Sequence, residues 1–286
     1  MDFGNIFKKA LKYPMNSNVY FFLLLINLII FLTGIPVSSY EQQVLLGAQP
    51  PTLIFYAVSL AFFIASTIVG IFLLGIYLHN AYEYYAKKKY ENLADSVSPS
   101  KKGFFHLLAG LVIILALALM AFFIFGGFSV FLTLSDLLTD ILVATGVIAA
   151  FVIIYFFSLA PDYVIVDKHN AASALMHSYQ TVKKNKIGTL VFLVLAVIFA
   201  VAINFVGAVP IISYSLVAGR YAISNLGQEV LMLFSLFQLL FTTYATLFLY
   251  SSLSNFYSEV RGKSKEVKKI VRAPKRKAPV RKGKKK

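Results

Sequence analysis

The chain has 286 residues, of which 59% are hydrophobic and only 14% are charged, and its formal net charge is +15. Soluble domains carry about 25% charged residues, so the composition and the mean hydropathy of +0.76 exclude an ordinary water-soluble protein. Cysteine is absent, which excludes disulfides and cysteine-ligated metal sites. The predicted class is an all-α integral membrane protein with anionic partners.

The first predicted element is an amphipathic helix over residues 3–13. Phe3, Ile6, Phe7 and Ala10 follow the spacing of one helix face. This spacing predicts a helix that lies on the membrane surface. The alternative is a helix that packs against the membrane spans.

Six apolar runs follow along the chain. A hydrocarbon core about 30 Å thick needs about 20 apolar residues per helical span, and a helix satisfies its own backbone hydrogen bonds, as lipid requires. The runs therefore predict a polytopic transmembrane six-helix bundle. The predicted spans are residues 19–35, 53–78, 104–125, 137–159, 187–209 and 230–250.

Basic residues indicate how the spans are oriented. Of 27 lysines and arginines, 26 lie in segments 1–18, 79–103, 160–186 and 261–286, and Arg220 is the exception. Basic connections stay in the cytoplasm. Both termini are therefore predicted to be cytoplasmic, which requires an even number of spans and agrees with six.

Charged residues on the outer side form one predicted cluster. Asp136 and Asp140 are four apart at the start of the fourth span, with Arg220 and Glu229 on the next outer connection. Acids at a helix start complement the helix dipole, and Arg220 is a predicted partner for them or for Glu229. The alternative is a cation site built on the paired carboxylates.

A motif follows the fourth span and predicts a structural elbow. Pro161 is expected to end the fourth helix. Asp167 and Asn170 are expected to accept hydrogen bonds from open backbone N–H groups, and the small residues Ala174 and Ser178 to let a surface helix approach a span closely. A ligand site is the alternative interpretation.

Lys183 and Asn185 complete this motif, within FFSLAPDYVIVDKHNAASALMHSYQTVKKNKIGTL. The order resembles a superfamily of six-helix prokaryotic membrane proteins, which includes YciC-like proteins and the membrane domain attached to some glycerophosphoryl diester phosphodiesterases. Gly70, Gly75 and the Gly103-Phe104-Phe105 sequence fit the same layout. The resemblance covers about residues 1–257. It implies a six-helix architecture and a place in a prokaryotic cell membrane, and it implies no enzymatic activity.

A second amphipathic helix is predicted at 171–184, capped by Asn170. Ala172, Leu175, Met176 and Tyr179 share one face of it. This helix is expected to lie flat on the cytoplasmic side before the fifth span.

Asn204 and Gln238 are the clearest polar residues in mid-span. A hydrogen bond between the fifth and sixth helices is the preferred interpretation, and a substrate contact is the alternative. Small residues four apart, such as Gly146 and Ala150, permit close helix contacts within one chain or in a homo-oligomer.

The chain is predicted to divide into an N-terminal amphipathic segment (1–18), a six-span membrane domain (19–257) and a disordered basic tail (258–286). From residue 261 the sequence has fourteen basic residues and one acid, with too little apolar content to fold alone. Anionic lipid headgroups are the nearest predicted partners, and RNA or the ribosome is the alternative. The tail residues predicted to bind polyanions are Arg272, Lys275, Arg276, Lys277, Arg281, Lys282, Lys284, Lys285 and Lys286.

No Gly-rich phosphate loop, GxSxG elbow or HExxH sequence occurs, so no catalytic, cofactor or metal site is predicted. The predicted function is a non-enzymatic membrane organiser or partner- and lipid-binding scaffold of unknown biochemical activity. One alternative is a transporter or permease for a small solute or lipid, which a polar cavity containing Asn204 and Gln238 would favour. A ribosome-contacting insertion helper, suggested by the tail, is the other.

Overall fold

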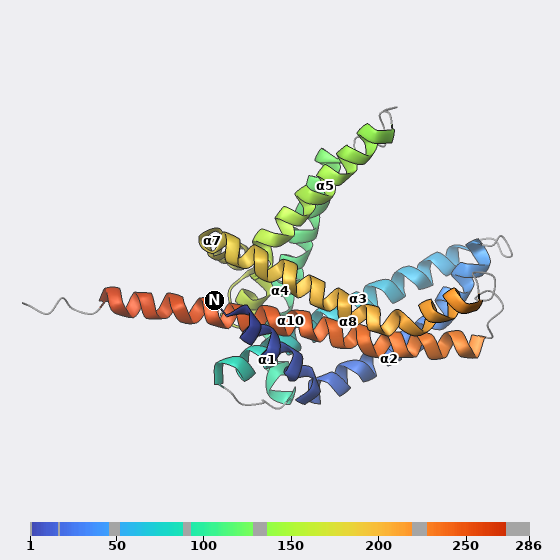
Figure 1. Cartoon of the computed structure of the whole chain (residues 1–286), viewed down its shortest axis with the longest axis horizontal. Helices are drawn as coiled ribbons and strands as arrows, with labels where there is room; N and C mark the ends of the chain where they lie inside the picture. Colours follow the sequence, from blue (N-terminus) through green and yellow to red (C-terminus); the bar gives the residue numbers. More distant parts are fainter. Residues whose placement is uncertain are drawn as a thin grey trace, which may run out of the picture.

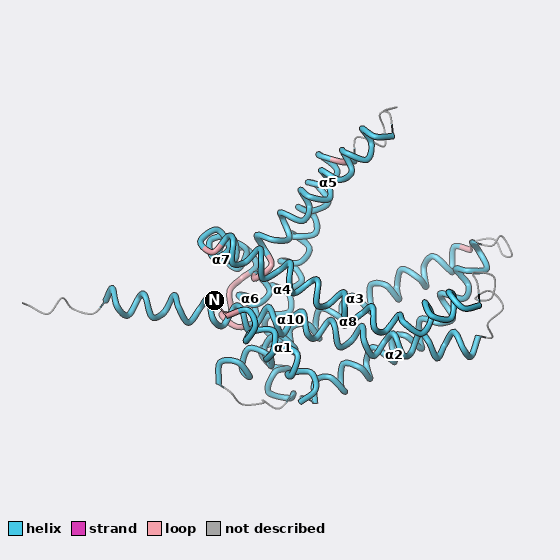
Figure 2. The backbone as a smooth tube through the Cα atoms, in the orientation of Figure 1, coloured by secondary structure: helices cyan, strands magenta, loops and turns pink. Residues whose placement is uncertain are grey.

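A computed structural model describes residues 2–16, 18–45, 52–87, 93–127, 136–218 and 228–272. Within these ranges the chain forms helices joined by short turns and loops, and no strand is present (Figure 2), which confirms the predicted all-α class. The helices are α1 (Phe3–Asn16), α2 (Asn18–Leu45), α3 (Leu53–Lys87), α4 (Leu93–Phe125), α5 (Asp136–Phe157), α6 (Ala160–Ile165), α7 (Ala171–Lys184), α8 (Lys186–Ala218) and α10 (Gln228–Arg272).

Within the described ranges, five helices are long and apolar enough to cross a membrane, and the bent pair α1–α2 raises the number to six. Large apolar side chains cover their outer surfaces, including Phe63, which is 67% exposed, and Val201, which is 61% exposed. Contiguous apolar surface of this kind is rare on soluble monomers and natural in lipid. The chain is a polytopic membrane protein whose helices contact the bilayer.

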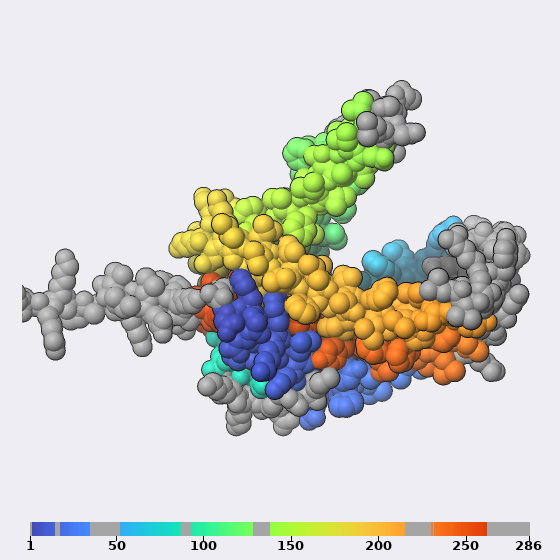
Figure 3. Space-filling view, in the orientation of Figure 1, coloured from blue at the N-terminus to red at the C-terminus, as the bar shows by residue number. Residues whose placement is uncertain are grey.

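The helices are arranged in two arms that meet at one end (Figure 1). One arm contains α4 and α5, and the other contains α2, α3, α8 and α10. The arms stand apart at their outer ends (Figure 3), and α1, α6 and α7 lie at the end where the arms meet (Figure 2). We call this common end the junction.

This two-armed arrangement differs from the compact bundle expected from the sequence. α3 approaches α4 closely near the junction, where a Cβ added to Gly75 would lie 3.2 Å from Cβ of Ser100. Farther out, α4 packs against α5 instead, with Gly126 and Gly146 in backbone contact. α4 therefore packs closely against α3 near the junction and against α5 farther out. This change of partner separates the outer half of α4 from the arm that contains α3.

Helix α1 packs its apolar face against the spans, which is the second of the two interpretations left open by its sequence. Ile6 and Ala10 are fully buried. The ring of Phe7 stacks on Phe192 of α8 with centroids 5.5 Å apart, and Phe192 stacks on Phe256 of α10 at 4.3 Å. Aromatic stacking of this kind stabilises a contact beyond simple burial, so α1 is part of the protein core at the junction.

The connection between the second and third predicted spans is largely helical. α3 continues to Lys87 and α4 begins at Leu93, whereas a polar loop was expected over 79–103. Ser96 and Ser100 are buried there, and Ser100 Oγ donates to the Ser96 carbonyl at 2.7 Å. Ser96 Oγ also accepts from Asn80 Nδ2 of α3 at 3.4 Å, so these buried hydroxyls have hydrogen-bond partners within α4 and across to α3.

The last helix extends past residue 258, where the sequence predicts the basic tail to begin. α10 continues as a helix to Arg272, and Ser258 Oγ donates to the carbonyl of Asn255 at 2.8 Å. Contacts of Arg261 described below anchor this extension. The binding residues predicted beyond Arg272 lie outside the described residues.

Candidate functional site

The elbow connects α5 to α7 through the short helix α6. α5 ends at Phe157, and Pro161 lies in the first turn of α6. A proline in that turn costs no hydrogen bond, because the first backbone N–H groups of a helix have no internal partner. Pro161 therefore opens α6, and the expectation that it ends the preceding helix is corrected.

Small residues of α7 form its contacts with α4 and with the end of α5. Ala174 is fully buried beside Leu107 of α4. Ser178 is also buried; its hydroxyl donates to the Phe156 carbonyl at 2.9 Å and accepts from the Leu159 N–H at 3.2 Å. The hydroxyl thus satisfies backbone groups left open where α5 ends.

The buried face of α7 differs from its predicted apolar face. Leu175 is buried, whereas Ala172, Met176 and Tyr179 are exposed. The buried face of α7 is the one that carries the small residues, because small side chains allow helices to approach closely. The larger apolar side chains Met176 and Tyr179 lie on the outside of the junction.

Both ends of α7 carry side-chain caps. Asn170 Oδ1 accepts from the Ser173 N–H at 2.9 Å, as an N-cap does. At the other end, Asn185 Nδ2 donates to the Thr181 carbonyl at 3.1 Å. Lys183 Nζ lies 5.6 Å from the centre of the Tyr179 ring. These motif residues therefore have local contacts within α7 and at its ends.

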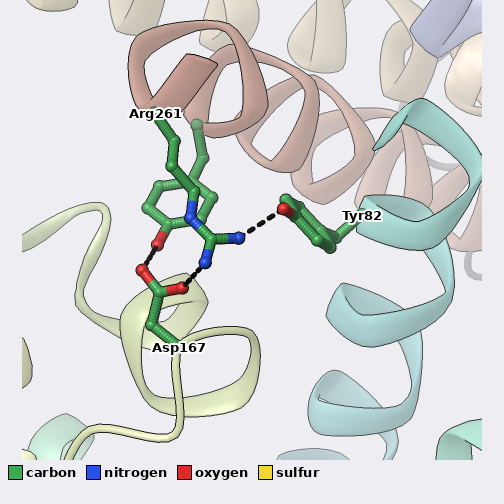
Figure 4. Close-up of polar contacts among 4 residues, drawn as sticks. Tyr82, Asp167 and Arg261 are labelled. Carbon is green, nitrogen blue, oxygen red and sulfur yellow. Dashed lines mark hydrogen bonds and ion pairs between the residues drawn. The ribbon is translucent and has the colours of Figure 1, made fainter. Parts of the chain in front are cut away.

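Asp167 makes long-range contacts instead of the predicted backbone ones. Its carboxylate accepts from the Tyr257 hydroxyl at 2.5 Å and forms an ion pair with Arg261. The Arg261 guanidinium also donates to the Tyr82 hydroxyl (Figure 4). We call Tyr82, Asp167, Tyr257 and Arg261 the latch, because they join the elbow to α3 and α10.

A second contact ties the elbow to α10. Asp162 is buried in α6, and its carboxylate accepts from Ser254 Oγ at 2.8 Å. The sequence did not indicate Asp162, or the residues of α10 that pair with the elbow, because the partners lie about 90 residues apart in the chain. Tyr82 and Tyr257 lie near the ends of predicted spans, but tyrosines in such places indicate only proximity to headgroups.

A cavity of about 340 Å³ lies between the start of α4 and the connection from α6 to α7. We call it the basic cavity. Lys168, which lines it, has a backbone φ of 58°, in the left-handed region that side-chain-bearing residues seldom adopt. The charged and histidine side chains around it are Asp95, Lys102, His106, Lys168 and His169.

A second cavity, of about 360 Å³, lies among α2, α3, α4 and α10. Its lining is mainly apolar, and Asn27 Nδ2 donates to Thr243 Oγ1 there at 3.0 Å. The mid-span residues Asn204 and Gln238 line neither this cavity nor the basic cavity. Asn204 Oδ1 accepts from Thr242 Oγ1 of α10 at 2.9 Å, while Gln238 is exposed. The predicted bond between these helices therefore uses Thr242.

The outer charged cluster lies mostly outside the described residues. Asp140 is exposed on α5. Asp136 begins α5 and Glu229 lies in α10, but their side chains are not among those described, and neither is Arg220. Within the described part of the chain, no group of three histidine, aspartate or glutamate residues is placed to hold a metal ion.

Comparison of the chain with protein-family models, curated proteins and solved structures gave no match.

Replacing Ser178 by alanine is expected to destabilise the elbow by about 1–2 kcal/mol, because the buried Leu159 N–H loses its acceptor. The thermal unfolding of the detergent-solubilised chain measures this effect. Gln180→Ala, at an exposed position of α7, is the control and should change little. Equal effects of the two substitutions would contradict the assigned role.

Proposed function

We propose that the chain is a non-enzymatic membrane organiser that gathers anionic lipids at its junction face. The observation that carries this proposal is the placement of lysines. Nine lysines on α1, α4, the elbow, α7 and the start of α8 are all exposed, and all these elements meet at the junction. They are Lys8, Lys9, Lys12, Lys101, Lys102, Lys168, Lys183, Lys184 and Lys186.

The same lysines support an orientation with the junction in the cytoplasm, since basic segments are retained there. We propose six crossings, by α2, α3, α4, α5, α8 and α10, with both termini inside. α7 then lies at the headgroup layer with Met176 and Tyr179 outward, a position suited to amphipathic rings and flexible apolar chains. We also propose the basic tail as a third unit of the chain, after the N-terminal segment and the membrane domain.

The elbow motif also leads us to propose membership of the six-helix superfamily that it resembles. Transport is not favoured, because Asn204 and Gln238, the residues on which that alternative depended, line neither of the two cavities described above. The ribosome-linked alternative depends on the tail and is tested with the lipid proposal.

The test is lipid enrichment around the full chain reconstituted in liposomes. Energy transfer from the labelled protein to a labelled anionic phospholipid is expected to exceed transfer to a labelled zwitterionic one about twofold or more, since each basic residue near the surface contributes about 1 kcal/mol. Replacing Lys8, Lys9 and Lys12 together by glutamine should reduce the enrichment. The matched lysine-to-arginine variant keeps the charge and should retain it.

Equal transfer to both lipids would overturn the proposal, as would solute flux that depends on the protein. Binding of RNA in preference to anionic lipid at about 150 mM salt would favour the ribosome-contacting alternative instead.

A further inference from the structure

The basic cavity brings two of the nine exposed lysines together with two histidines in one hollow. Its α4 wall carries Lys102 and His106, which are one helical turn apart and share a face. Phe105 between them is 76% exposed, and the apolar run of α4 begins here. The cavity therefore lies beside the start of the apolar run of α4.

The opposite wall holds Lys168 in an anchored loop. On one side of it, Asp167 is held by the latch, and on the other Asn170 caps α7. The His169 N–H donates to the Tyr163 carbonyl at 3.2 Å. A left-handed backbone at a lysine costs free energy, and it persists only where the surroundings impose it. This loop fixes the backbone of Lys168 at the rim of the cavity.

His169 is also held in place. Its Nδ1 lies 3.2 Å from Ser173 Oγ, and its ring lies 4.6 Å from the ring of His177. The ring is therefore oriented by α7 rather than free to turn, which suits a group that supplies one directed hydrogen bond.

The charge balance favours an anion. Two lysines and two histidines face the cavity against one acid, Asp95, and Val164 and Ile165 supply apolar surface. Ammonium and imidazole N–H groups donate strong hydrogen bonds to phosphate oxygens. We propose that the basic cavity binds one phosphate group, carried by a lipid headgroup or by a soluble molecule.

The experiment compares phosphate-bearing probes on the full chain. Native mass spectrometry in detergent measures adducts with short-chain phosphatidic acid and, as the uncharged reference that lacks a phosphate group, with short-chain diacylglycerol. Calorimetry measures binding of inorganic phosphate. Lys102→Gln with Lys168→Gln is expected to weaken binding about tenfold, as the loss of charge-assisted hydrogen bonds predicts.

Lys101→Gln with Lys184→Gln is the matched control. Lys101 lies on α4 and Lys184 at the end of α7; both are exposed and neither lines the cavity, so binding should be unchanged. Because the control removes the same charge, it separates the cavity from general attraction to the basic face.

Two further variants separate binding from folding. Asp95→Asn removes the one acid of the cavity and should tighten binding severalfold, which a folding defect cannot do. Lys168→Gly relieves the left-handed backbone and should raise the melting temperature while it weakens binding.

A loss seen only with phosphatidic acid identifies the lipid headgroup as the source, and a loss that includes inorganic phosphate identifies a soluble ligand. Equal adducts and equal affinities in the wild type, the cavity variant and the control would overturn the inference. That result would leave the lipid-enrichment test untouched, because that test depends on the exposed lysines of α1 rather than on this cavity.

Discussion

Gly146→Leu is expected to destabilise the α4–α5 arm by about 3 kcal/mol, the upper part of the usual range for overpacking. A Cβ at this position would lie 2.9 Å from Cα of Gly126 and 2.9 Å from the carbonyl oxygen of Phe122. Both are backbone atoms, so no side chain can rotate to make room. The two helices would have to separate along their contact.

The midpoint of unfolding in increasing denaturing detergent measures this effect. Gly188→Leu in α8 is the control, because a Cβ there meets nothing within 4 Å. If both substitutions shift the midpoint equally, the close helix contact does not stabilise the arm. The sequence did not decide whether its small residues make helix contacts within one chain or between two copies. The contact of Gly146 with Gly126 lies within one chain.

Asp167→Ala is expected to cost about 1–3 kcal/mol, because it leaves the Arg261 guanidinium and the Tyr257 hydroxyl without their shared acceptor. The Arg261 side chain is 27% exposed and that of Asp167 15%. Solvent therefore screens part of the interaction, and the cost should fall below that of a fully buried ion pair.

A double-mutant cycle isolates this contact. Asp167→Ala and Arg261→Ala, alone and combined, should give a coupling free energy of about 1 kcal/mol or more in thermal or denaturant unfolding. Lys183→Ala combined with Asp167→Ala serves as the control pair and should be additive. A coupling near zero would mean that the latch contributes nothing to holding the elbow against α10.

The latch and the basic cavity share the elbow but act differently. The Asp167 carboxylate is occupied by α10, whereas the next residue, Lys168, is exposed at the cavity. Disturbing the latch should therefore also loosen the loop that presents Lys168. For this reason the test of the cavity uses Lys102 and Lys168 rather than Asp167.

The sequence by itself determined the elements whose causes are local. The number and approximate position of the apolar helices follow from the thickness of the bilayer and the lengths of the apolar runs. The helix at 171–184 follows from its periodicity and from the cap at Asn170, whose hydrogen bond spans only three residues. The interfacial position of that helix remains a prediction.

Only the tertiary structure decided which faces of the helices meet. A helix in lipid is apolar on every side, so its periodicity does not distinguish the face that touches protein from the face that touches lipid. Helix contacts depend instead on shape, as at Gly126 and Gly146, and on a few polar pairs. For that reason the partner of Asn204 proved to be Thr242, and that of Asp167 an arginine assigned to the tail.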